Sequence, residues 1–122
     1  MSERHSSFKT HTWLWFLQRV TAVFLVVVLG FHFLWLHFVN HAGDITMQGT
    51  VGRMQQLGYF IAMLLFLFTA AFHGLNGVYN ALINQGLSGR PKRVLKWILV
   101  GAGVLVSIQG VRIASAMAGV SL

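Results

Sequence analysis

The chain has 122 residues, of which 56% are hydrophobic and only 9% are charged, against about 25% charged in soluble domains. This composition predicts an integral membrane protein and leaves no room for a separate soluble domain. The sequence contains no cysteine, so disulfides, thiolate metal sites and iron–sulfur ligation by this chain are excluded.

The formal net charge of +7 comes mostly from short basic patches beside apolar runs. The basic residues of these patches are Arg4, Lys9, Arg19, Arg90, Lys92, Arg93 and Lys96. Such patches are typical topology signals and also attract anionic lipid headgroups. The sequence lacks the mixed basic and aromatic surface that reads nucleic acid, so membrane lipid is the predicted partner and nucleic acid is not.

Three apolar runs are each long enough to cross a bilayer as a helix, which takes about 20 mostly apolar residues. We predict an all-α, single-domain chain over 1–122 with spans at about 16–39, 57–83 and 94–115. Helices are expected because the bilayer core offers no water to backbone polar groups. The first run is longer than the core of a signal peptide and no small-residue cleavage site follows it, so we expect it to be retained. The polar connections at 40–53 and 85–92 are rich in turn-forming residues.

The distribution of Lys and Arg predicts the orientation of the chain. Basic residues precede the first span and fill the second connection, whereas the first connection has only Arg53, set against Asp44. The positive-inside rule therefore predicts a cytoplasmic N-terminus, a cytoplasmic second connection and an external C-terminus. The tryptophans agree with this, since interfacial indoles are expected near span ends: Trp13, Trp15, Trp35 and Trp97.

The second span ends in a polar cluster led by a histidine. His73, Gly77, Asn80 and Asn84 are separated by four, three and four residues, so they lie on one face of a helix. Ionisable groups at membrane depth are costly and mark candidate functional sites. Two interpretations are open: a packing seam with hydrogen bonds across a helix interface, or a haem site in which His73 is an axial ligand. Gly74 and Gly77 would let a flat group approach the backbone beside the imidazole.

The first span contributes histidines at two depths and an arginine at its start. At 1.5 Å per residue, His32 lies roughly 18–24 Å from the inner end of the span, and His37 lies about 7 Å further out. We therefore predict His32 as a buried ligand and His37 as part of the hydrated outer rim. Arg19 is either a snorkelling topology charge or a clamp for an anion such as a haem propionate or a polarised quinone oxygen. Arg112 in the third span offers the same choice, and its outer position favours snorkelling.

The order of motifs resembles a known family. The run QRVTAV at residues 18–23 opens an apolar helix, His-Gly-x-x-Gly follows at 73–77, and a basic turn leads into a third span. This arrangement resembles the hydrophobic membrane anchors of succinate dehydrogenase, respiratory complex II, and is most similar to the D-type anchor. The resemblance covers nearly the whole chain in length, span count and orientation.

The resemblance implies cofactors and partners. His73 matches an axial ligand of haem b, with the other ligand supplied by a partner anchor subunit, and Arg19 matches a residue near the haem propionates and the quinone pocket. Gly77 belongs to the same haem-binding motif. His32 matches a histidine of members with two haems, so we expect two haems, with His73 and His32 as iron ligands in this chain.

The resemblance also implies a role within a larger enzyme. The chain would be a non-catalytic anchor in a bacterial or archaeal cytoplasmic membrane, packed with a second anchor subunit into a helix bundle. Its further partners would be a flavoprotein subunit and an iron–sulfur subunit, and the complex would pass electrons from succinate, a tricarboxylic acid cycle intermediate, to quinone. Relatives carry an Asp-Tyr pair where this sequence has Asn84 and Gln85. Both residues can hydrogen-bond a quinone carbonyl, but neither is a phenol that donates a proton.

Other functions remain open at this point. The same architecture could anchor a fumarate reductase, which runs the reverse reaction. A small transporter or channel subunit could line a polar pathway with His73 and the asparagines, although three spans without internal repeats count against it. A structural assembly factor would need only the packing seam.

Overall fold

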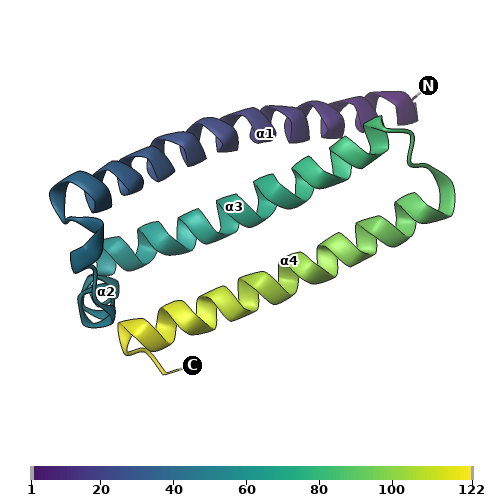
Figure 1. The fold of residues 1–122 in the computed structure, drawn as a ribbon. Coiled ribbons are helices and arrows are strands. Elements are labelled where there is room, and N and C mark those ends of the chain that lie inside the picture. The colour runs from purple at the N-terminus through teal and green to yellow at the C-terminus, as the bar shows by residue number, and fades with distance from the viewer. Residues whose placement is uncertain (1, 122) are drawn as a thin grey trace.

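The computed structural model describes residues 2–121, with side chains described for residues 12–41 and 43–121. In this part of the chain the regular elements are all helical (Figure 1). They are α1 (Ser2–Leu34), α2 (Met47–Met54), α3 (Leu57–Asn84) and α4 (Gly89–Ala118). The predicted all-α class with three long apolar helices is confirmed. Arg4 and Lys9 of the predicted basic tail lie outside the described side chains.

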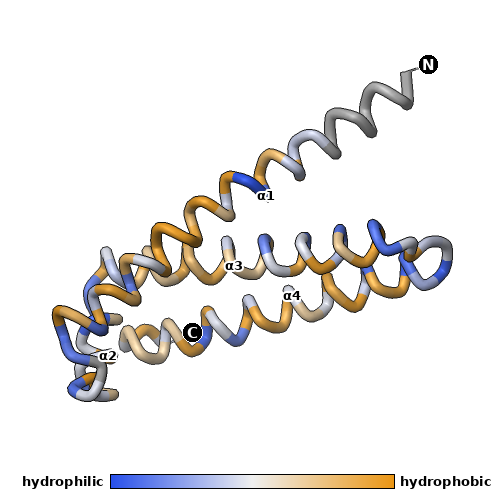
Figure 2. Tube along the Cα trace, turned by 45° about the horizontal axis from the view of Figure 1, so that its top comes forward, coloured by the Kyte–Doolittle hydropathy of each residue, from blue (hydrophilic) through white to orange (hydrophobic). Residues whose placement is uncertain are grey.

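The long helices are apolar enough to cross a membrane over Thr12–Val39, Leu57–Asn84 and Gly89–Ala118. At 1.5 Å per residue, α3 alone is about 42 Å long, which exceeds the roughly 30 Å hydrocarbon core. The helices therefore extend into the headgroup region or tilt. Figure 2 shows hydrophobic residues along most of their length, with hydrophilic residues in the connections, within α1 and along the half of α3 that leads to the α3–α4 connection.

Helix α4 begins at Gly89, before the predicted start of the third span at residue 94. Pro91, which belongs to the predicted connection at 85–92, lies in the first turn of α4; proline fits there because a backbone N–H in that turn has no partner in any case. Ser88 precedes the helix with extended backbone at φ −145°. The turn is tight because Gly86 and Gly89 adopt φ of +100° and +67°, a region that favours glycine.

The end of α1 and the first connection are more ordered than the sequence predicts. Helix α1 continues as a π turn over Trp35–Val39, closed by the N–H of Asn40 donating to Trp35 O at 3.1 Å. The short helix α2 follows, with Thr46 as its N-cap: the Thr46 hydroxyl oxygen accepts from the N–H of Gly49 at 3.1 Å. The sequence predicts only a turn-rich connection here and misses α2. The helix has just eight residues, and two of them are glycines and one is threonine, so it shows little helical periodicity. Its one buried side chain, Met54, packs where α2 contacts α3 and α4.

Helix α3 lies between α1 and α4, and it contacts both (Figure 1). The N-terminal end of α1 and the α3–α4 connection lie at one end of the molecule, whereas α2 and the C-terminus lie at the other. This arrangement gives α3 two packing interfaces on different faces.

The α3–α4 interface is closely packed through glycines of α4. A Cβ added at Gly103 would lie 2.5 Å from Leu75 Cδ1, and one added at Gly110 would lie 2.5 Å from Leu67 Cδ2. Both leucines of α3 therefore occupy space that only glycine leaves open. Small residues of this kind let membrane helices approach closely and gain dispersion energy.

Candidate functional site

Polar contacts between α1 and α3 are concentrated around His73. Thr21 Oγ1 lies 3.0 Å from His73 Nδ1, and Gln18 Nε2 donates to the backbone oxygen of His73 at 3.1 Å. The Gln18 side-chain oxygen accepts from Asn76 Nδ2 at 2.7 Å. Residues 18 and 21 share one face of α1 because they are three positions apart, and residues 73 and 76 share one face of α3 for the same reason.

These side chains border a hollow of about 580 Å³ between the two helices, within the size range of small-molecule sites. Its lining comes from both helices: Leu14, Trp15, Gln18, Arg19, Ala22, His73, Asn76, Gly77, Tyr79, Asn80, Ala81 and Asn84. The predicted polar face of α3 therefore lines one hollow, together with the predicted Arg19 of α1.

His73 uses only one of its two ring nitrogens within the protein. Nδ1 contacts Thr21, whereas Nε2 has no hydrogen-bond partner among residues 12–41 and 43–121. The contact with Thr21 fits the packing-seam interpretation, because it joins two helices. It does not exclude the ligand interpretation, because metal-binding histidines usually have a hydrogen-bond partner on the second nitrogen.

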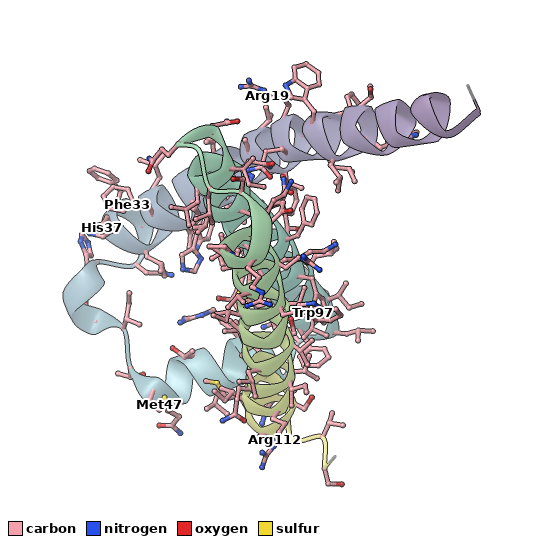
Figure 3. All side chains as sticks on the ribbon, turned by 90° about the vertical axis from the view of Figure 1, so that its right-hand side faces the viewer. Arg19, Phe33, His37, Met47, Trp97 and Arg112 are labelled. Carbon is pink, nitrogen blue, oxygen red and sulfur yellow. The ribbon has the colours of Figure 1, made fainter. Side chains whose placement is uncertain are left out.

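Arg19 lies at the rim of the hollow and is exposed. Its guanidinium carbon is 5.5 Å from the centroid of the Trp15 ring, which is within cation–π range. Figure 3 shows its side chain on the outer side of α1, away from α4. No acidic side chain is among the described residues that line the hollow, so no carboxylate there neutralises this charge. The position suits an anion that enters from the rim.

The two glycines beside His73 differ in their surroundings. A Cβ at Gly77 would lie 3.2 Å from Gln18 Nε2, whereas a Cβ at Gly74 would meet nothing within 4 Å. Gly77 therefore leaves room for the Gln18 amide and also lines the hollow, and its role beside a haem stays a prediction. The open approach to the backbone is at Gly74.

His32 lies at the same α1–α3 interface but apart from His73. It is half-buried and borders a small cavity of about 160 Å³ with Val28, Leu29, Met63 and Phe66. The eleven positions between Thr21 and His32 correspond to about 16 Å along α1. No hydrogen bond to His32 occurs among the described side chains.

The side chain of His37 contacts Phe33, one turn earlier in the same helical segment. Its ring stacks on Phe33 at a centroid distance of 4.1 Å, and its Nδ1 donates to Phe33 O at 3.2 Å. The side chain is exposed and lies with Phe33 at the far end of α1 (Figure 3). This position agrees with the predicted outer rim.

The remaining predicted residues lie at the ends of α3 and α4. Asn84 lines the hollow, but Gln85 caps the helix end and does not line it. Arg112 is exposed near the C-terminal end of α4, where Nη1 lies 3.5 Å from Gln109 Oε1 (Figure 3). It is at the opposite end of the molecule from the α3–α4 connection.

Sequence reasoning gave no role to Gln18, Thr21 or Asn76, which form the contacts around His73. Gln18 and Thr21 stand within the quoted run at 18–23, and their three-residue spacing on an otherwise apolar helix is the feature that could have identified them. Among the described residues no three His, Asp or Glu side chains gather as for a bare metal ion.

Residues 2–110 match the sequence model of the succinate dehydrogenase/fumarate reductase transmembrane subunit family. The chain therefore belongs to this family and is an integral membrane subunit of such a complex. The predicted resemblance is confirmed at this level. Searches of curated proteins and of solved structures give no match.

Proposed function

We propose that this membrane subunit is a D-type anchor of a succinate:quinone oxidoreductase and that it binds haem b through His73. The observation that supports this most is the setting of the imidazole. One ring nitrogen is hydrogen-bonded to the neighbouring helix, the other has no partner among the described side chains, and the residue lines a hollow of about 580 Å³.

The residues around the hollow fit a haem. Gly77 lines the hollow one turn from His73 and has no side chain that would hinder a flat macrocycle, whereas Gly74 is exposed outside the hollow. Arg19 at the rim supplies a positive charge for a propionate. Leu14, Trp15 and Ala22 give the hollow an apolar wall that a macrocycle can contact. A bound haem would take up and release single electrons at a potential set by its ligands, burial and nearby charge.

The second axial ligand would come from the partner anchor subunit, since no second histidine is among the described residues that line the hollow. His32 would bind a second haem nearer the other membrane face. Its support is its half-buried position at the α1–α3 interface and its ring without a protein partner among the described residues. Met63 and Phe66 border its cavity, so this second site is more crowded than the first.

Quinone would bind near the inner end of α3. Asn84 lines the hollow and its amide can donate to a quinone carbonyl, as Gln85 can from the adjoining turn. Neither side chain can supply a proton, so the protons of quinone reduction would come from other subunits or from water.

The orientation and partners follow the charge distribution. The N-terminal end of α1 and the basic first turns of α4 lie at one end of the molecule, which we assign to the cytoplasm of a bacterium or archaeon. The flavoprotein and iron–sulfur subunits would dock at that end, near the hollow. The second anchor would pack beside α1 and α3 to complete the haem site.

The first test is spectroscopic. The complex purified with its partner subunits should show a reducible b-type Soret band, and His73→Ala should lose the band of the haem that it binds while the complex still assembles. His37→Ala is the matched control and should keep the full spectrum. A complex without haem would refute the proposal and favour a transporter or a structural membrane subunit.

A fumarate reductase anchor is the alternative within the family. The direction is tested by comparing succinate-dependent quinone reduction with quinol-dependent fumarate reduction in the same preparation. The proposal expects the first rate to exceed the second. The reverse order would assign the chain to a fumarate reductase without changing its haem site.

A further inference from the structure

We propose that Thr21 is a positioning residue for His73: its hydroxyl oxygen accepts the Nδ1 proton and so leaves Nε2 as the nitrogen that binds haem iron. The inference rests on the proposed haem function and adds to it a residue of the neighbouring helix. Its starting point is the 3.0 Å distance between Thr21 Oγ1 and His73 Nδ1.

The direction of this hydrogen bond follows from the other contacts of the Thr21 hydroxyl. Oγ1 lies 2.7 Å from Leu17 O and 3.2 Å from Gln18 O, both one turn back in α1. A carbonyl oxygen is an acceptor only, and a hydroxyl has a single proton to donate. Because that proton points to the carbonyls, Oγ1 meets the imidazole as an acceptor and Nδ1 is the donor.

The tautomer of His73 is then fixed. A neutral imidazole carries one proton, so a protonated Nδ1 leaves the lone pair on Nε2. Nε2 has no hydrogen-bond partner among the described residues, and the side chain lines the hollow. Histidines that bind metals usually donate their other N–H to an oxygen acceptor, which orients the ring and raises its basicity. Thr21 provides this acceptor from across the helix interface.

Gln18 keeps the two helices in the register that this contact needs. Its amide nitrogen donates to the backbone oxygen of His73 at 3.1 Å, and its amide oxygen accepts from Asn76 at 2.7 Å. A backbone oxygen has two lone pairs, so His73 O can accept this bond in addition to its helical one. Gly77 lacks the side chain that would displace the Gln18 amide. Gln18 therefore holds the backbone of His73, while Thr21 orients its ring.

Two effects should follow if the hydroxyl is removed without changing the volume of the side chain. The imidazole loses the contact that selects its tautomer and orientation, so haem binds more weakly. Without the acceptor at Nδ1 the ring also donates less electron density to the iron, so the ferric form is stabilised less and the midpoint potential becomes more positive.

The experiment compares Thr21→Val, Thr21→Ser and Thr50→Val in the purified complex. Thr50 is a matched control, because its hydroxyl also donates one turn back, to Thr46 O at 3.1 Å, and accepts from Arg53 Nη2 at 3.0 Å, but it lies in α2. The readouts are the haem-to-protein ratio, the midpoint potential and the electron paramagnetic resonance spectrum of the oxidised haem. Thr21→Val should bind haem about 10- to 100-fold more weakly, with a positive shift of the potential and an altered spectrum. Thr21→Ser and Thr50→Val should match the unmodified complex.

The outcomes separate this inference from the function on which it rests. An unmodified complex without haem refutes the proposed function itself. Haem in the unmodified complex, with an unchanged ratio, potential and spectrum in Thr21→Val, overturns the role of Thr21 alone. If Thr21→Val does not assemble, Thr21→Ala is measured in its place and should shift the potential in the same direction. Failure of both variants to assemble would overturn the inference, because Thr21 would then be a packing residue.

Discussion

The two interfaces of α3 are built in opposite ways. Toward α4, Leu67 and Leu75 fill the space left by glycines, and the helices are in close contact. Toward α1, His73 and Asn76 make hydrogen bonds to Gln18 and Thr21 beside a hollow of about 580 Å³. The first interface only joins helices, whereas the second joins them and leaves a space lined by an imidazole whose Nε2 has no partner among the described side chains.

This difference explains why α3 carries leucines on the face toward α4 and polar residues on the face toward α1. Lipid tails are as apolar as leucine, so a membrane helix gains little by burying leucine unless the packing is close. Hydrogen bonds across the α1–α3 interface can replace close packing at the level of His73, and this permits a cofactor-sized space next to it.

The largest expected effect is a loss of haem on substitution of His32, which tests whether the α1–α3 interface binds a second haem at the level of that residue. His32→Ala should remove about half of the haem, because that iron would lose its ligand from this chain. Haem is counted per assembled complex from the reduced-minus-oxidised spectrum. His37→Ala should have little effect, since its Nδ1 is bonded to Phe33 O. A single haem per unmodified complex would contradict the role of His32.

The next largest expected effect is a loss of stability when the α3–α4 interface is overpacked. Gly110→Leu should lower the free energy of unfolding by about 1–3 kcal/mol, the usual cost of overpacking, because a Cβ there already meets Leu67. Thermal unfolding of the purified complex measures the change. Gly101→Leu is the control, since a Cβ at that exposed glycine meets nothing within 4 Å.

A second substitution added to Gly110→Leu tests whether the contact with Leu67 is the cause of the lost stability. Adding Leu67→Ala to Gly110→Leu should recover part of the lost stability, because it vacates the space that the new side chain needs. Haem content should stay near that of the unmodified complex. Equal destabilisation by Gly101→Leu and Gly110→Leu would show that the Gly–Leu contacts are not specific.

A smaller effect, on the apparent KM for quinone, is expected from substitutions at the inner end of the hollow. Asn84→Ala should raise the apparent KM for quinone about 2- to 10-fold, which corresponds to one hydrogen bond of about 0.5–1.5 kcal/mol. Gln85→Ala should change it less, because Gln85 does not line the hollow. Steady-state quinone reduction measures both. A larger effect at Gln85 would move the quinone site out of the hollow and into the adjoining turn.

The smallest effect is electrostatic. A positive charge near the haem stabilises its reduced form, so Arg19→Gln should make the midpoint potential more negative. Because Arg19 is exposed, we expect only about 10–40 mV, which corresponds to an exposed charge pair of about 0.2–1 kcal/mol. This shift is opposite in sign to that expected for Thr21→Val. Arg112→Gln at the far end of α4 should leave the midpoint potential unchanged. An equal shift in that variant would contradict a specific contact between Arg19 and the haem and would leave Arg19 with the role of a topology charge.

The sequence predicts the long helices and the polar face of α3 because both depend on periodicity within one segment. Asn80 and Asn84 lie on the face that their spacing indicates, and Arg19 lies at the same hollow. The partner of each α3 residue depends on how α1 is rotated and shifted against α3, which no local pattern specifies. Gln18 and Thr21 were therefore missed, as was the contact between the Gln18 amide and Gly77. Helix α2 was missed because it is short and its stabilisation comes from the Thr46 cap and from contacts with distant helices.

The most direct test of this account is an experimental density map of the assembled complex around residue 73. We expect porphyrin density with its iron beside His73 Nε2, while Nδ1 keeps its contact with the Thr21 hydroxyl. A map in which both ring nitrogens bond protein groups, with no porphyrin in the hollow between α1 and α3, would contradict it.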